Sequence, residues 1–278
     1  NPAKTSMIIV LLLVILNGLI NRFPALISVY NLSYWQNQFS KSQLVIGDKA
    51  PYFFSDEDIY SIVGIKYLLG DLPTNLHPEV PPLGKILVGS SIFIFKNISI
   101  ISLLFAICSL LLVYLLGRYS NLPKNWSILA LIIISLDKQF WYLSTSAMLD
   151  IFLLVFLLLA FLSAYRGLKN PSWFLLSSLF LGFMASTKLY FTSLVAVAVC
   201  TLAILSTGSF KKFIQFIFSL IFYPVGFMLP YINSFLEGIS LLDFLRFQRW
   251  LTHWWAGNSK VPFGGILPMI FLITISVG

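Results

Sequence analysis

The sequence predicts an all-α, polytopic membrane protein of about eight transmembrane helices, and three observations support this fold class. The 278 residues are 58% hydrophobic and 10% charged, whereas an average soluble domain is roughly 45–50% apolar and about 25% charged. Apolar runs of roughly 17–22 residues recur along the chain, which matches the thickness of a bilayer's hydrocarbon core. The runs lack the alternation of barrel strands, and helices satisfy their own backbone hydrogen bonds in lipid.

The apolar runs place the transmembrane spans in order along the chain. The expected spans are residues 5–21, 98–116, 126–143, 147–165, 171–187, 189–207, 213–233 and 264–278. The first run follows Lys4 and lacks a clear small-residue cleavage site, so we expect a retained anchor. The last run stops with the sequence, and we expect a C-terminal remainder beyond it.

The distribution of charge predicts the orientation of these spans. With a cytoplasmic N-terminus, one set of short loops holds seven basic and no acidic residues: Lys4, Arg118, Lys124, Arg166, Lys169, Lys211 and Lys212. This is the positive-inside pattern. All ten acidic residues then fall on the extracytoplasmic side, although Asp137 is provisional because its span can end near Ser135. Any functional site built on carboxylates is therefore expected on that side, in a prokaryotic plasma membrane or the endoplasmic reticulum membrane.

Two outer loops interrupt the spans. The first, residues 22–97, is too long for a simple connection and holds six carboxylates. Within it we expect interfacial helices over 56–70, which has an acidic first turn, and over 84–95, which is too short to span. The last outer loop is residues 234–263. Because no internal repeat or soluble domain is visible, residues 1–278 are expected to form a single transmembrane catalytic domain.

The first candidate site is the acidic start of the 56–70 helix, where Ser55 precedes Asp56, Glu57 and Asp58. These residues suit an ordinary helix N-cap, because carboxylates and hydroxyls bind free backbone amides. They also suit a general base, which takes a proton from a hydroxyl group within hydrogen-bond reach. The two interpretations are compatible.

Three charged residues near the outer ends of helices form a second group. Lys85 follows the prolines of P-P-L-G-K in the first turn of the 84–95 helix, where it can bind a phosphate or snorkel to headgroups. Asp150 stands where an apolar run begins, a costly position unless the carboxylate is paired or lines a cavity. Lys188 is the sole charge between two apolar runs and can bind a carboxylate or a lipid phosphate.

The last outer loop mixes Arg246, Arg249 and His253 with tryptophans. Tryptophans at this level are most often interface anchors, and stacking on a sugar is the sharper alternative. His253 has no ligand partners at metal-binding spacing, so no metal site is predicted; a divalent cation stays possible. Walker, Rossmann, serine-hydrolase and zincin motifs are absent from the sequence, and its basic pI gives no reason to invoke nucleic acid.

Four short motifs together resemble the protein O-mannosyltransferase family of the GT-C glycosyltransferases. They are Asp56-Glu57, the P-P-L-G-K stretch from Pro81 to Lys85, Leu149-Asp150, and G-x-x-x-S-x-K from Gly182 to Lys188. The resemblance implies a GT-C-like fold and transfer of mannose, or a related hexose, from a polyprenyl-phosphate donor to a hydroxyl acceptor with inversion. The acceptor it implies is a protein Ser or Thr.

The resemblance also implies residue roles. Asp56, with Glu57 beside it, matches the family's candidate base, and Lys85 and Lys188 would lie near the lipid phosphate. Arg246, Arg249, His253 and Asp150 complete the expected donor-binding set. No cofactor beyond the possible cation is expected, and the oligomeric state is left open.

Three alternatives stay open. The acceptor can be a lipid-linked glycan or a lipid headgroup. The chain can instead be a transporter or flippase, although transporters place charges near the midplane in repeated halves. A catalytically inactive homologue is the third, because Val80 replaces the histidine usual before the prolines, and Ser144, Thr145 and Ser146 stand where an arginine is often found.

Overall fold

The computed structural model describes residues 2–188 and 190–258, and within them it contains helices and no strands. Contacts divide the chain into two compact units, Asn1–Asn233 and Ser234–Gly278. The helices of the first unit are α1 (Pro2–Ile27), α2 (Leu32–Phe39), α3 (Gln43–Ile46), η1 (Gly47–Lys49), α4 (Asp56–Leu68), α5 (Pro82–Phe95), α6 (Ile100–Tyr119), α7 (Lys124–Leu136), α8 (Lys138–Leu143), α9 (Asp150–Gly167), α10 (Ser172–Thr187), α11 (Tyr190–Leu205), α12 (Phe210–Ser219), α13 (Phe222–Met228) and η2 (Leu229–Tyr231). Helix α14 (Ile232–Leu236) crosses the boundary, and α15 (Leu241–Asn258) belongs to the second unit.

Four segments are long and apolar enough to cross a membrane: Thr5–Ile27, Ile100–Tyr119, Asp150–Gly167 and Phe210–Leu236. They coincide with four of the predicted spans, so the all-helical membrane class is confirmed. The predicted count of about eight is not confirmed. Three further predicted spans correspond to α7, α10 and α11, which are apolar but have only 13 to 16 residues; sixteen residues rise about 24 Å, less than a hydrocarbon core of about 30 Å. The predicted span 264–278 lies outside the described residues.

The predicted span 126–143 is broken at Asp137. Helix α7 ends at Leu136, and Asp137 has an extended backbone (ψ 120°). Its carboxylate accepts the backbone N–H of Gln139 at 2.8 Å, which caps α8. The carboxylate therefore starts a new short helix and does not lie inside a continuous span.

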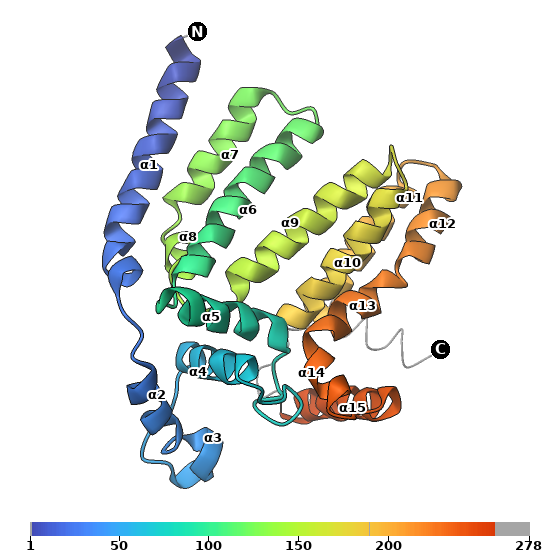
Figure 1. The fold of residues 1–278 in the computed structure, drawn as a ribbon. Coiled ribbons are helices and arrows are strands. Elements are labelled where there is room, and N and C mark those ends of the chain that lie inside the picture. The colour runs from blue at the N-terminus through green and yellow to red at the C-terminus, as the bar shows by residue number, and fades with distance from the viewer. Residues whose placement is uncertain (1, 189, 259–278) are drawn as a thin grey trace. The chain divides into compact units, whose positions relative to one another are not determined.

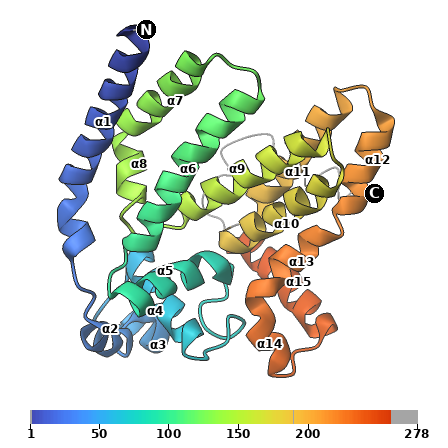
Figure 2. The ribbon, with the colours of Figure 1, turned by 45° about the horizontal axis from the view of Figure 1, so that its top comes forward.

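In the first unit, the long helices α6, α7, α9 and α10 run side by side, and α4 and α5 lie across one end of them (Figure 1). A view turned by 45° shows the same arrangement (Figure 2). The core includes Ile62, Val88, Phe152 and Leu181, which come from α4, α5, α9 and α10 and are essentially inaccessible. The two crossing helices are thus packed onto the bundle. Their bounds agree with the predicted helices 56–70 and 84–95, and their place at the membrane interface stays a prediction.

Helices α4 and α5 pack at unusually close range through two glycines. A Cβ atom on Gly64 would lie 2.0 Å from the carbonyl oxygen of Lys85, and one on Gly89 would lie 2.3 Å from the carbonyl carbon of Gly64. No side chain fits such a gap without moving a backbone. The two glycines therefore allow the close crossing that determines the position of α4 on α5.

Candidate functional site

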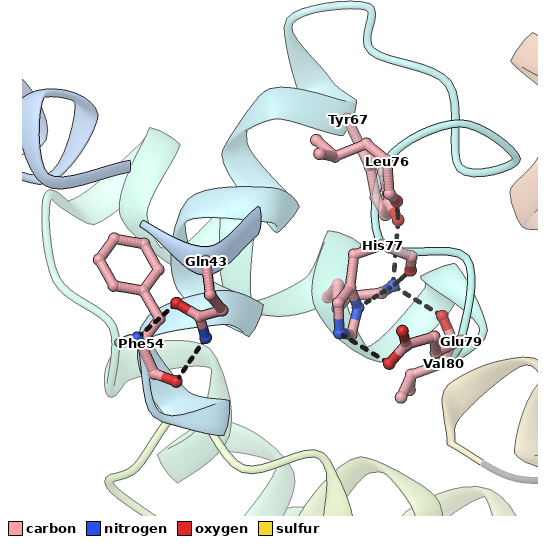
Figure 3. Close-up of polar contacts among 8 residues, drawn as sticks. Gln43, Phe54, Tyr67, Leu76, His77, Glu79 and Val80 are labelled. Atoms are coloured by element: carbon pink, nitrogen blue, oxygen red, sulfur yellow. Dashed lines mark hydrogen bonds and ion pairs between the residues drawn. The ribbon is translucent and has the colours of Figure 1, made fainter. Parts of the chain in front are cut away.

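The start of α4 is fixed by hydrogen bonds on both sides of Ser55. Ser55 Oγ accepts the backbone N–H of Asp58 at 3.3 Å, and Asp58 Oδ2 accepts the backbone N–H of Ser55 at 3.1 Å, which forms a capping box. One residue earlier, the Gln43 carboxamide holds the backbone of Phe54 with two hydrogen bonds, at 2.8 and 3.0 Å (Figure 3). Asp58 thus serves the cap, and the two carboxylates before it are left for other contacts.

Asp56 and Glu57 have different neighbours. Glu57 accepts a hydrogen bond from the hydroxyl of Tyr142 and a longer one, at 3.4 Å, from the backbone N–H of Ala147. Asp56 is exposed, and its carboxylate raises the pKa of the hydroxyl of Tyr60, one turn further along α4. Successive residues lie about 100° apart around a helix. The acidic pair is therefore divided: one carboxylate joins α4 to the segment before α9, and the other faces a separate cluster.

Tyr60 marks that cluster. It is 4% exposed, and burial raises the pKa of its hydroxyl; the carboxylates of Asp56, Asp150 and Glu79 raise it further. These three carboxylates come from the start of α4, the start of α9 and the segment before α5. All three raise the pKa of one buried tyrosine, although they are up to 94 residues apart in the sequence.

Asp150 also forms the ion pair that closes the cluster. Lys188, which follows the last residue of α10, lies 2.9 Å from both carboxylate oxygens of Asp150. Both side chains are about one-third exposed, at 37% for Asp150 and 30% for Lys188. Hence the pair is reachable by a ligand, and its aspartate starts an apolar helix without being isolated. We call Asp56, Tyr60, Glu79, Asp150 and Lys188 the carboxylate cluster.

Lys85 lies beside the cluster but is fully buried. Its Nζ donates to the carbonyl oxygens of Val80 at 2.6 Å and His77 at 2.8 Å, and to the Tyr67 hydroxyl at 3.0 Å. It also lies 3.3 Å from Nδ1 of His77. Figure 3 shows these loop residues gathered beside Glu79. These hydrogen bonds hold the segment between α4 and α5 in place.

The electrostatics of this segment follow from burial. Burial, followed by the charge of Lys85, lowers the pKa of His77 to about 3, so its ring is neutral at pH 7 and its Nδ1 can accept a hydrogen bond. Burial lowers the pKa of Lys85 well below its usual range, against the opposing charge of Glu79. Burial is also the main reason why the pKa of Glu79 is raised. Glu79 thus binds a proton more readily than an ordinary glutamate does.

The structure brings together three of the predicted site residues, Asp56, Asp150 and Lys188, through Tyr60. Lys85 has no exposed surface, and four acceptors surround its ammonium group; its contact with a lipid phosphate stays a prediction. Glu57 is engaged with Tyr142 rather than facing the same cluster as Asp56.

The other three predicted residues, Arg246, Arg249 and His253, lie on α15 in the second unit. Arg246 forms an exposed ion pair with Asp243 at 3.2 Å. His253 Nδ1 lies 2.8 Å from the carbonyl oxygen of Arg249. Their roles in donor binding stay predictions.

Residues that the sequence alone does not assign to the site include Tyr60, Glu79, His77 and Tyr142. Tyr60 carries a weak signal, since it lies four residues after Asp56 and therefore on the same helix face. Tyr142 carries none, because its contact with Glu57 joins residues 85 apart. Near Glu57 there is also a hollow of about 220 Å³, lined by Ser28, Val29, Tyr30, Trp35, Glu57, Asp58, Ser61 and Ile98.

Across the described residues, no group of three or more histidine, cysteine, aspartate or glutamate side chains is placed to hold a metal ion. Three carboxylates raise the pKa of the Tyr60 hydroxyl, and one of them, Asp150, is paired with Lys188. The cluster offers a base, a proton-binding carboxyl group and a cation.

Comparison with known proteins gives one match. The sequence model of a family described as dolichyl-phosphate-mannose-protein mannosyltransferase matches residues 79–231, which is more than half of the chain. No curated protein and no solved structure matches.

Proposed function

Because the chain belongs to the dolichyl-phosphate-mannose-protein mannosyltransferase family, we propose that it moves mannose, or a related hexose, from a polyprenyl-phosphate donor to the hydroxyl group of a protein Ser or Thr. The family makes the chain a glycosyltransferase, and its apolar helices make it an integral membrane protein. The observation that carries the finer proposal is the partly exposed ion pair between Asp150 and Lys188, whose aspartate acts, like Asp56, on the hydroxyl of Tyr60.

In this proposal Asp56 is the general base. Its carboxylate is exposed, whereas Asp58 is used by the helix cap and Glu57 by Tyr142. As the acceptor oxygen forms a bond to the anomeric carbon, Asp56 takes the hydroxyl proton. The bond between that carbon and the phosphate oxygen breaks, and its electron pair leaves with the polyprenyl phosphate. Attack opposite the leaving group inverts the anomeric centre.

We assign the leaving phosphate to Lys188. Its side chain is 30% exposed, and a donor phosphate can share its ammonium group with Asp150. A cation at that position stabilises the negative charge that develops as the bond breaks. Lys85 is proposed as a positioning residue instead, because its hydrogen bonds fix the loop that carries Glu79.

The test compares two single-charge changes at the start of α4. Full-length Asp56→Asn and Asp58→Asn are incubated with labelled polyprenyl-phosphate mannose and a Ser/Thr-rich peptide. Loss of a general base costs about 10²–10⁴-fold in rate, so Asp56→Asn should lose transfer by that factor. Asp58→Asn should keep it, because the side-chain oxygen of asparagine can still accept the Ser55 backbone N–H of the capping box.

Equal activity of the two variants would remove Asp56 from the mechanism. Folding is checked by helical content and by monodispersity in detergent. The identity of the labelled product decides the acceptor: label in a lipid-linked glycan or lipid headgroup, with none in the peptide, would replace the protein acceptor while leaving the role of Asp56 in place.

A further inference from the structure

A second polar hollow lies away from the carboxylate cluster, between α1 and the α7–α8 segment. Its volume is about 640 Å³, and it is lined by Leu13, Val14, Asn17, Gly18, Asn21, Arg22, Ser135, Leu136, Lys138 and Trp141. Both ribbon views show α1 running beside α7 and α8 (Figures 1 and 2). The proposed sugar transfer uses none of these residues.

Close packing of glycine against tryptophan forms the floor of this hollow. A Cβ atom on Gly18 would lie 2.0 Å from the indole of Trp141, so the ring sits directly on the backbone of α1. The indole N–H of Trp141 donates to the carbonyl oxygen of Ser135 at 2.7 Å. The ring is therefore held in one orientation, and the hollow is a built feature of the fold.

Apart from the Trp141 indole, the polar side chains that line the hollow have no hydrogen-bond or ion-pair partner within the described part of the chain. Arg22 and Lys138 form no ion pair there. Ser135 is 2% exposed, and its hydroxyl has no hydrogen-bond partner. Asn17 and Asn21 lie one turn apart on α1, so their carboxamides share a face. A buried hydroxyl without a partner costs stability unless a ligand satisfies it.

The chemistry of the lining matches a phosphate group attached to an acyl or prenyl chain. Two cations and two carboxamides supply donors for phosphate oxygens. Leu13 and Leu136 are 59% and 63% exposed at the same hollow and give an apolar wall. A single lysine or arginine snorkelling to headgroups needs no such cavity.

The depth of the hollow along α1 agrees with a headgroup. Arg22 lies five residues before the end of the apolar segment Thr5–Ile27, or about 8 Å along the helix axis. Lys138 comes two residues after the end of α7. Both cations therefore lie near one end of the spanning helices, where phosphates of that leaflet lie.

We propose that this hollow binds the phosphate headgroup of a membrane lipid, with Arg22 and Lys138 neutralising the phosphate. The site also borders the catalytic region, because the Arg22 guanidinium lies 5.5 Å from the ring of Tyr142, whose hydroxyl donates to Glu57. The proposal does not depend on the sugar transfer, and binding tests it directly.

The experiment is native mass spectrometry of the full chain in detergent, titrated with phosphatidylglycerol or with phosphatidylcholine of the same acyl chains. Each cation near an anionic lipid surface adds to the binding free energy, and two cations together change the affinity for an anionic lipid about 30-fold. The variant Arg22→Gln/Lys138→Gln should bind phosphatidylglycerol more weakly by that factor. The matched control Lys41→Gln/Lys49→Gln removes the same charge from the exposed first loop and should bind like wild type.

A second variant, Asn21→Leu, tests the hollow without changing charge and should also weaken binding. Equal lipid affinity in the charge variant and its control, both folded by helical content, would overturn the proposal. Displacement of the lipid by equimolar inorganic phosphate would overturn it too, because the site would then bind a free anion. A third arm with polyprenyl phosphate identifies the source: tighter binding than phosphatidylglycerol, lost in the charge variant, would support the site and assign it to the prenyl lipid.

Discussion

Replacement of Lys85 by methionine tests whether this lysine holds the loop between α4 and α5. The change keeps an unbranched side chain, one heavy atom shorter, and removes four contacts at 2.6 to 3.3 Å. The carbonyl oxygens of His77 and Val80 then lose their buried donor, at about 1–3 kcal/mol each. Relief of the buried charge offsets part of this, so we expect a net loss of about 2–4 kcal/mol in the free energy of unfolding.

The matched control is Lys66→Met. Lys66 pairs with Asp71 at 2.6 Å, but the two side chains are 28% and 45% exposed, and such surface pairs are worth about 0–1 kcal/mol. Unfolding is followed by loss of helical circular dichroism as SDS is titrated into mixed micelles. Limited proteolysis of residues 71–81 gives a second readout, which should speed up only in Lys85→Met. Coincident unfolding curves for the two variants would refute the supporting role of Lys85.

Three further predictions concern pH, packing and the ion pair. Because the pKa of His77 falls from 6.5 to about 3 on folding, the unfolded chain binds more protons between these pH values. The free energy of unfolding is therefore highest above pH 6.5 and falls by a few kcal/mol as the pH drops towards 3. A pH series of SDS titrations should show this fall in wild type and not in His77→Gln. Gly64→Ala forces a Cβ against the carbonyl of Lys85 and should cost about 1–3 kcal/mol in the same titration; an unchanged midpoint would contradict the close crossing. Asp150→Asn should cost no more than about 1 kcal/mol in stability, because its pair with Lys188 is partly exposed, yet lower kcat for sugar transfer; kcat and stability that fall together would indicate a purely structural pair.

Much of the helical plan could be predicted because it follows from local composition. The acidic start of α4 and the prolines before α5 both mark helix starts that the structure contains. The sequence left two possibilities open at Asp137: the helix ends just before it, or the carboxylate lies inside the span in an ion pair. The number of spans was less predictable, because hydrophobicity does not reveal that α10 and α11 stop at 16 residues.

The site was predictable to the extent that its charges stand at helix ends. Asp56, Asp150 and Lys188 were recognisable for that reason, whereas their convergence on Tyr60 depends on tertiary packing. The burial of Lys85 was not foreseeable. A lysine in the first turn of a helix suggests an exposed anion site, and only the fold shows that the preceding loop supplies its acceptors.

The division of the acidic pair has a consequence for how relatives of this chain should vary. Glu57 depends on the Tyr142 hydroxyl, so substitutions at these two positions should occur together across homologues. Asp56 has its neighbours elsewhere and should vary independently of position 142. The D-E dipeptide, which looks like one unit in the sequence, would then record two separate selective constraints.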